Sequence, residues 1–322
     1  MTYTAGSTIL ASDYNGFVSN GATNINDIWS TGATDKGWGQ SAMVNVTALS
    51  SVTALRWSNL VNNLATMGSH TGTTLTSRTA PVASNTISIL PSVATDITSL
   101  NTNRGNAVAS GSQYTGWTGT NSKTTDTTGA FTLTFTNTIT FPSAAQARYF
   151  WNAGGLIKIQ VSKTSTGNTG DPEWNDLANT LCGAIWFSGR VNGAAQTIAG
   201  TSYSGTKQVG GTGTPVTLQT NIGWYNLTAS PPGSNFILYE QRADTSPYTG
   251  NYIQHGVRNV TDTGLQINTS WYNAEGDTIT GGTAATGATP GTAPCTIVTY
   301  YPPSTTYLTN SWGTPTVAAT VT

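Results

Sequence analysis

The sequence predicts a mainly β protein, in which a short helical N-terminal region precedes a β-sandwich-like body that carries one or two short helices. Composition is the first reason, because 62 of the 322 residues are threonine. Threonine is β-branched and suits a half-exposed strand, while 36 glycines and 13 prolines supply turns. The second reason is that the spacing of apolar residues changes near residue 110 from a helical to an alternating pattern.

Residues 1–110 are predicted to form a helical region for anchoring or oligomerisation. Ser12 and Asp13 are expected to cap its first helix, Gly68 to end the second, and Pro91 to lie in the first turn of the third. Short helices need partners, so either a small helical domain or a bundle shared between subunits is expected. The apolar faces consist of Tyr14, Phe17, Val18, Ile25, Ile28 and Trp29, then Val52, Leu55, Trp57 (near the edge), Leu60, Val61 and Leu64, then Ile87, Leu90, Val93, Ile97 and Leu100.

Residues 111–129 are predicted to be a linker and residues 130–322 a β-rich body. Two short helices are expected in this body, one from Ser143 to the pair Gly154-Gly155 and one from Asp171 to Gly183. Residues 200–215 and 281–294 are rich in glycine and threonine and are expected to be loops. Alternating or apolar runs predict strands at 131–135, 156–161, 184–187, 222–227, 235–240, 252–260, 265–272 and 296–301.

The charge content excludes several classes of function. Only 8% of the residues are charged and the net charge is −1, so no basic run is present to bind nucleic acid. No apolar run is long enough to insert into a membrane, and residues 1–6 lack the features of a signal peptide. Ten tryptophans, 13 tyrosines and 7 phenylalanines supply a core, which argues against disorder. A chain made in the cytoplasm with the surface of an extracellular protein fits a virion component released by lysis.

No group of residues predicts catalysis. We therefore expect that the protein is not an enzyme and that it has no catalytic residue, bound metal or cofactor. Asp171, Glu173 and Asp176 are the densest acidic group. They favour the positive end of a helix, and the alternative is a glycosidase carboxylate pair. Glu275 and Asp277 are expected in a solvated turn, with a surface cation site as the alternative.

The two histidines and two cysteines also predict no catalytic or metal site. His70 and His255 have no nearby metal-ligand partner and no GxSxG nucleophile motif to serve. Cys182 and Cys295 are expected to be two buried thiols, with a disulfide across the β body as the alternative.

Aromatic residues in the C-terminal half are the remaining functional signal. Trp224, Trp271, Tyr301 and Trp312 lie beside Thr- and Asn-rich segments, and exposed rings with such neighbours predict contact with glycans. The alternative is that they serve in core packing and subunit contacts. Adjacent aromatic residues on a strand point to opposite faces, so each such pair offers one ring outward at most.

Three segments carry a resemblance to a known group. ASDYN at 11–15, DKGWGQS at 35–41 and FPSAAQARYFWNAGG at 141–155 together resemble segments of structural, fibre-like virion proteins of tailed phages of aquatic bacteria, notably cyanophages. The resemblance covers residues 1–70 and 130–190. It implies a virion structural protein and no catalytic residue.

Together these observations predict a structural protein of the virion. We expect a tail or neck fibre or appendage subunit that forms a homotrimer and contacts other virion proteins and a host-surface glycan. The alternatives are a capsid decoration protein, a lectin-like receptor-binding module and, with least support, a polysaccharide depolymerase.

Overall fold

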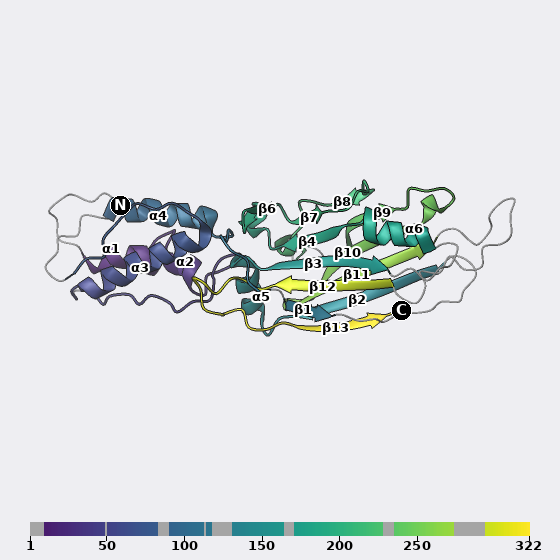
Figure 1. The fold of residues 1–322 in the computed structure, drawn as a ribbon. Coiled ribbons are helices and arrows are strands. Elements are labelled where there is room, and N and C mark those ends of the chain that lie inside the picture. Colours follow the sequence, from purple (N-terminus) through teal and green to yellow (C-terminus); the bar gives the residue numbers. More distant parts are fainter. Residues whose placement is uncertain are drawn as a thin grey trace.

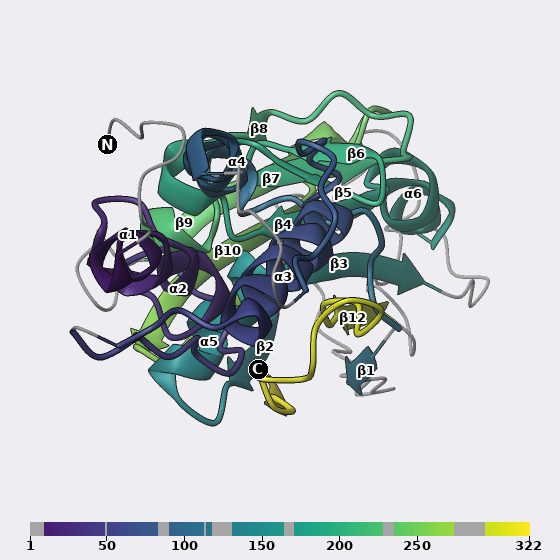
Figure 2. The same ribbon diagram turned by 90° about the vertical axis from the view of Figure 1, so that its left-hand side faces the viewer.

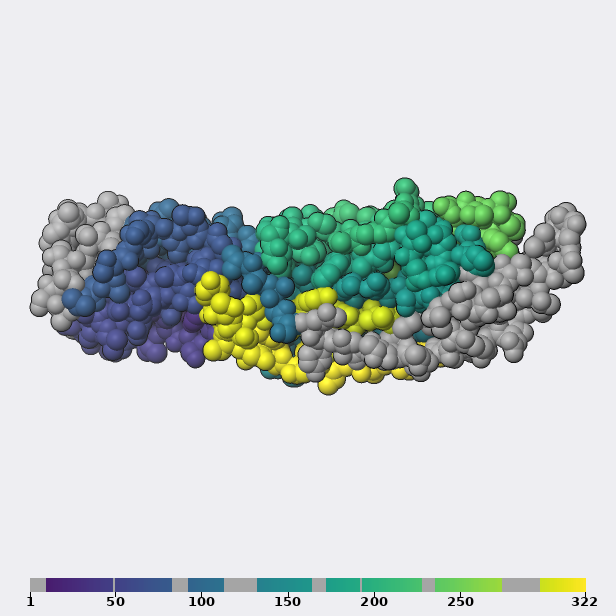
Figure 3. All heavy atoms as spheres, in the orientation of Figure 1, coloured from purple at the N-terminus to yellow at the C-terminus, as the bar shows by residue number. Residues whose placement is uncertain are grey.

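The computed structural model describes residues 10–48, 50–82, 90–112, 114–117, 131–163, 171–227, 235–273 and 294–322. The molecule is elongated, with the helices of the N-terminal region at one end and two antiparallel sheets at the other (Figures 1 and 3). The fold is therefore mainly β behind a helical N-terminal region, as predicted. Figure 2 views the molecule from its helical end.

In its described residues, the helical end contains five helical segments. They are α1 (Ala11–Asn15), the π-helix η1 (Gly16–Asn20), α2 (Ile25–Trp29), α3 (Ala54–Thr71) and α4 (Leu90–Asn103). The prediction of one continuous helix over residues 14–29 is wrong. Gly21 is extended, and the Asn24 side chain accepts a hydrogen bond from the Asp27 amide, so a second helix begins there.

Several details of the predicted helices need correction. The first helix already begins at Ala11, and the carboxylate of Asp13 accepts a hydrogen bond from the Leu10 amide at 2.8 Å. The second helix runs past Gly68 to Thr71 and ends at Gly72, which has a φ of +68°. Leu55, predicted on the apolar face, is 69% exposed, and α3 instead buries Trp57, whose ring contacts those of Tyr14 and Phe17. Pro91 lies in the first turn of α4, as predicted.

The β body consists of two antiparallel sheets and a small hairpin. In spatial order, the five-stranded sheet contains β1 (Tyr114–Trp117), β12 (Pro294–Tyr301), β3 (Leu156–Lys163), β4 (Ala184–Ser188) and β7 (Thr206–Val209). The six-stranded sheet contains β13 (Thr316–Val321), β2 (Phe131–Thr140), β11 (Gly264–Asn273), β10 (Tyr252–Thr261), β9 (Phe236–Arg242) and β8 (Thr217–Leu218). β5 (Gln196–Ile198) and β6 (Thr201–Tyr203) form the hairpin.

Short helices accompany the sheets. α5 (Ala144–Asn152) begins at Ser143, whose side chain accepts from the Gln146 amide at 3.2 Å, as expected. α6 (Asp171–Asp176) continues into the π-helix η2 (Leu177–Leu181), so the helix expected before Gly183 is present. The remaining short elements are η3 (Val191–Gly193), α7 (Trp224–Leu227) and η4 (Tyr248–Gly250).

Three predictions about the β body need correction. Residues 114–117 of the expected linker form β1, because their backbone pairs with β12, and residues 118–130 lie outside the described residues. The expected strand at 222–227 is α7, a helical turn. The expected loop at 200–215 contains strand residues of β6 and β7, since β7 pairs with β4. Most of the other expected loop, up to residue 293, lies outside the described residues.

Strand β2 shows how threonine is used. Its Leu133, Phe135 and Ile139 are buried in the core, while the intervening threonines lie on the other face. There the hydroxyl of Thr136 donates to the Asn268 side chain of β11 at 2.9 Å, and the hydroxyl of Thr138 accepts from the side-chain Nε2 of Gln266 at 3.2 Å. Uncharged cross-strand pairs therefore cover this face.

One hydrophobic core runs through both ends of the molecule. It joins residues of the N-terminal helices, such as Trp57 and Leu100, to residues of both sheets, such as Ile159 and Leu265. Burial of this continuous apolar surface is the main term that holds the helical end against the β body.

Candidate functional site

The sequence segments 35–41 and 141–155 meet where the helical end contacts the β body. We call this contact the joint and define it by Trp38, Gln40, His70, Tyr149 and Asn152. Trp38 is fully buried, and its indole Nε1 donates to the carbonyl oxygens of Arg104 at 3.1 Å and of Asn152 at 3.2 Å. A single side chain thus ties the residue that follows α4 to the last residue of α5.

Glycine permits the close approach of the two segments. Gly39 has a φ of +69°, and a Cβ at this position would lie 2.4 Å from the Tyr149 ring. Gly37 has a φ of +92°, and its carbonyl accepts a hydrogen bond from the Asn152 side chain at 3.0 Å. A side chain at either position would be strained by the positive φ, and one at position 39 would also collide with the Tyr149 ring of α5.

Gln40 connects the joint to the C-terminal segment. Its amide nitrogen donates to the Thr309 carbonyl at 2.9 Å, and its amide oxygen accepts from the Thr309 hydroxyl at 2.7 Å. Ser311 also donates to the Trp38 carbonyl. The segment that follows β12 therefore returns to the helical end before the chain enters β13, as Figure 1 shows.

His70 packs edge-on against Trp38, with ring centroids 4.9 Å apart. Burial is the main cause that lowers the pKa of His70 to about 4, and a backbone hydrogen bond with Ala153 opposes that effect only partly. The imidazole is therefore neutral at neutral pH. His255 is likewise buried, with its pKa lowered to about 3 by burial and its Nδ1 3.0 Å from the Thr269 hydroxyl.

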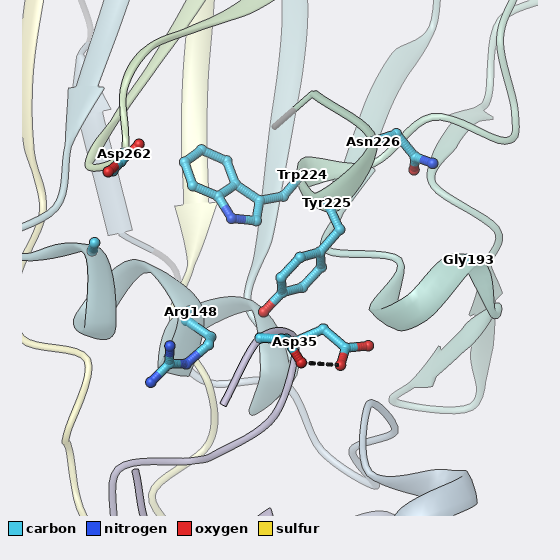
Figure 4. Close-up of a pocket in the computed structure, with 9 residues that line it drawn as sticks. Asp35, Arg148, Gly193, Trp224, Tyr225, Asn226 and Asp262 are labelled. Atoms are coloured by element: carbon cyan, nitrogen blue, oxygen red, sulfur yellow. Dashed lines mark hydrogen bonds between the residues drawn. The ribbon is translucent and has the colours of Figure 1, made fainter. Parts of the chain in front are cut away.

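A groove of about 700 Å³ opens beside the joint. Figure 4 shows the Tyr225 side chain pointing toward Asp35, with Arg148 nearby and Asp262 beyond Trp224. The groove is lined by Thr34, Asp35, Ala144, Arg148, Gly193, Trp224, Tyr225, Asn226 and Asp262.

Most polar groups of this groove are engaged within the protein. Asp35 pairs with Arg104 at 2.8 Å, and Arg148 donates to the Thr31 carbonyl at 2.6 Å. The Tyr225 hydroxyl donates to the Asn152 side chain at 2.7 Å, and burial, assisted by the Asp35 charge, raises its pKa. These interactions fix the shape of the joint.

Three of the four aromatic residues predicted to contact glycans are buried. Trp271 is fully buried, Trp312 is 2% exposed and Trp224 is 4% exposed, so the expectation that these rings are outward-facing is wrong. Trp271 faces the core because β11 turns its neighbour Tyr272 outward, and Trp224 stacks on Trp151 at 5.7 Å. The buried rings provide core packing, which was the alternative interpretation.

Tyr301 is the one predicted aromatic residue that remains partly exposed. Its ring lies 4.8 Å from that of Trp186, and Trp186 lies 6.2 Å from Tyr203. Sequence reasoning did not select Trp186 or Tyr203. The alternation in β4, where Ile185 and Phe187 are buried, was the signal that places Trp186 on the outer face.

The acidic and sulfur-bearing candidates lie as follows. Glu173 of α6 is 8% exposed, and burial is the main cause that raises its pKa. Cys182 is a free buried thiol whose pKa burial raises to about 12, so it forms no disulfide. The side chains of Asp171 and Cys295, and all of 274–293 with Glu275 and Asp277, lie outside the described residues.

Within the described part of the chain, no three His, Cys, Asp or Glu side chains gather closely enough to hold a metal ion. None of the helices described there combines the length and hydropathy that crossing a bilayer requires. Comparison of the chain with protein-family models, curated proteins and solved structures gives no match.

Proposed function

We propose that this chain is a structural subunit of a tailed-phage virion, of the tail- or neck-fibre type. The observation that carries the proposal is the joint. Two of the three segments that resemble phage structural proteins, 35–41 and 141–155, bind each other there through Trp38 and Asn152. The two segments therefore have a role in holding the fold together. A resemblance in such segments requires no shared catalytic residue.

The surface and the shape of the molecule support the proposal that it is an appendage subunit. The chain hydrates its sheets with threonine and asparagine pairs such as Thr136 with Asn268, which suits a particle exposed to changing salt. The long axis, with helices at one end and sheets at the other (Figure 3), suits attachment by one end. In this proposal the helical end anchors a homotrimer to other virion proteins, and the β body projects outward.

A lectin-like receptor-binding module is the second candidate function. The partly exposed rings of Trp186 and Tyr301, with lysines beside them, favour it. A capsid decoration protein would use the same chemistry at another location. A depolymerase gains no support from Glu173, whose carboxylate is buried on α6.

Immunogold electron microscopy of purified particles tests the proposal. An antibody against the full chain should label a tail or neck appendage, and particles lacking the gene for this chain are the control. Labelling of the capsid surface would favour the decoration protein instead. Absence of the chain from purified particles by mass spectrometry would overturn the proposal. Light scattering of the purified chain should give three times the monomer mass of 33.5 kDa.

A further inference from the structure

The outer face of the five-stranded sheet carries a cluster that the joint does not use. We call it the aromatic–lysine surface and define it by Lys158, Trp186, Tyr203, Lys207 and Tyr301. In the register of the sheet, Lys158 of β3 and Lys207 of β7 are the two cross-strand partners of Trp186 on β4. Cross-strand partners share a face, so a tryptophan stands between two lysines.

Ring and ammonium positions make this surface continuous. The Nζ of Lys158 lies 5.9 Å from the centre of the Trp186 ring, and the Nζ of Lys207 lies 5.7 Å from the centre of the Tyr203 ring. Tyr203 is 6% exposed and supports the cluster from β6, whereas Trp186 and Tyr301 are partly exposed. The two tilted rings thus each keep part of their surface in contact with solvent, with an ammonium group close to them.

The two lysines, Lys158 and Lys207, form no ion pair with any carboxylate that the structure describes. Lys207 donates to the Ser202 carbonyl at 3.3 Å, which is a neutral acceptor. In a chain with only 12 lysines and arginines, two such cations beside partly exposed rings form a local positive surface.

A second ring cluster on the other sheet provides a contrast. Tyr252 of β10 stacks on Tyr272 of β11 at 4.7 Å, and Arg242 lies 5.6 Å from the centre of the Tyr252 ring. Arg242 is paired with Glu240 at 3.0 Å, so this cluster is neutral. The two sheets therefore carry similar ring–cation contacts. Of the two clusters, the aromatic–lysine surface is the one with net positive charge.

We propose that the aromatic–lysine surface binds a sugar that carries an anionic group. The faces of Trp186 and Tyr301 pack against the C–H face of a pyranose ring, and the Nζ atoms of Lys158 and Lys207 donate charge-assisted hydrogen bonds to its carboxylate or sulfate. Two cations are too few to follow a nucleic-acid backbone, which disfavours single-stranded DNA. The proposal deepens the lectin-like candidate function and rests on it.

Titration calorimetry with the full chain tests this binding. The probes are an oligogalacturonate, its fully methyl-esterified form, a sulfated dextran oligomer and an oligothymidylate. We expect binding of the oligogalacturonate, the sulfated oligomer or both, and loss of galacturonate binding on esterification. The double variant Lys158→Gln/Lys207→Gln should weaken binding about tenfold or more, because charge-assisted hydrogen bonds are lost. Binding should also weaken as salt is raised.

Arg242→Gln is the matched control, because it removes a cation from the neutral ring cluster and should leave affinity unchanged. Trp186→Phe, which keeps a ring but reduces its face, should weaken binding less than the lysine double variant does. Equal affinity for the esterified probe, an unchanged affinity in the double variant, tighter binding of oligothymidylate, or no binding of either anionic sugar would overturn the proposal. The immunogold experiment does not depend on sugar binding. If the chain binds neither anionic sugar but labels an appendage, the sugar-binding proposal is wrong and the structural role is retained.

Discussion

The two ends of the molecule are stabilised by different polar interactions. Three of the four ion pairs found in the described part of the chain lie in or next to the helical end, and they join Lys36 to Asp27, Arg78 to Asp96 and Arg104 to Asp35. The β body has the fourth, at a partly exposed position.

The sheets instead use neutral side-chain pairs, such as Thr136 with Asn268 and Gln266 with Thr138. Neutral cross-strand pairs repeat along a strand at little desolvation cost. A helix that buries polar residues in a tertiary contact must satisfy each one individually. The difference teaches that, among the described residues, this chain forms most of its ion pairs where no repeating ladder satisfies the polar groups.

Replacing Trp38 should have the largest effect, because the joint lies between the two regions. Trp38→Ala removes a fully buried indole and two hydrogen bonds, so we expect a loss of about 3–5 kcal/mol in the free energy of unfolding. Urea unfolding followed by circular dichroism should show one transition for the native chain and two for the variant. Tyr307→Ala, at a position 38% exposed, is the control. A loss below about 1 kcal/mol would mean that the joint does not couple the two ends.

Breaking the buried ion pair of the helical end should have the next largest effect. Arg78 and Asp96 have side chains only 4% and 6% exposed, and Asp96 also accepts from the Thr76 amide at 3.1 Å. Asp96→Asn leaves a buried guanidinium without its counter-charge and should cost about 3 kcal/mol. Glu240→Gln breaks the pair of the β body, where Arg242 is 48% exposed, and should cost less than about 1 kcal/mol. Similar losses in the two variants would contradict the comparison.

Acidification should act on both ends through their buried histidines, with a smaller effect from each histidine at pH 5 than from the loss of the buried ion pair. The pKa of His70 is about 4 in the folded chain and about 6.5 when unfolded, so the unfolded state binds more protons between these values. The contribution of neutral His70 to the free energy of unfolding is therefore fully present above pH 6.5. It is lost as the pH drops toward 4, by about 3 kcal/mol at most. His255, with a folded pKa of about 3, acts in the same direction within the β body.

Unfolding free energies measured from pH 7 to 5 check this prediction. Because the native chain unfolds in one transition, His70→Gln and His255→Gln should each flatten the pH dependence of the same free energy of unfolding. An unchanged slope in both variants would show that other groups set the acid sensitivity.

Much of the fold could be predicted from the local spacing of apolar and capping residues. The alternation of Leu133 and Phe135 with threonine predicted β2, and the cap at Ser143 predicted α5. The break at Gly21 was harder, because the apolar spacing continues across it while the chain changes direction. Residues 222–227 are predicted as a strand and form a helical turn, because four apolar or aromatic residues in a short run fit either structure.

The candidate sites were less accessible. Trp271 and Tyr272 are adjacent, and sequence alone says that they face opposite sides without saying which side is the core. Only the packing of β11 against α6, with Trp174 and Trp271 5.6 Å apart, decided it. Trp186 and the two lysines beside it come from three strands, so no local motif could join them.

The sequence by itself determined that this chain is mainly β with helices first, since threonine content and apolar period are local properties. It also determined that few charges are available to hold the chain together. The tertiary structure alone decided which rings are buried, and that residues 35–41 and 141–155 meet across Trp38 and Asn152. The physical reason is that burial and long-range hydrogen bonds depend on which surfaces exclude water together, and neighbours in the chain do not specify that.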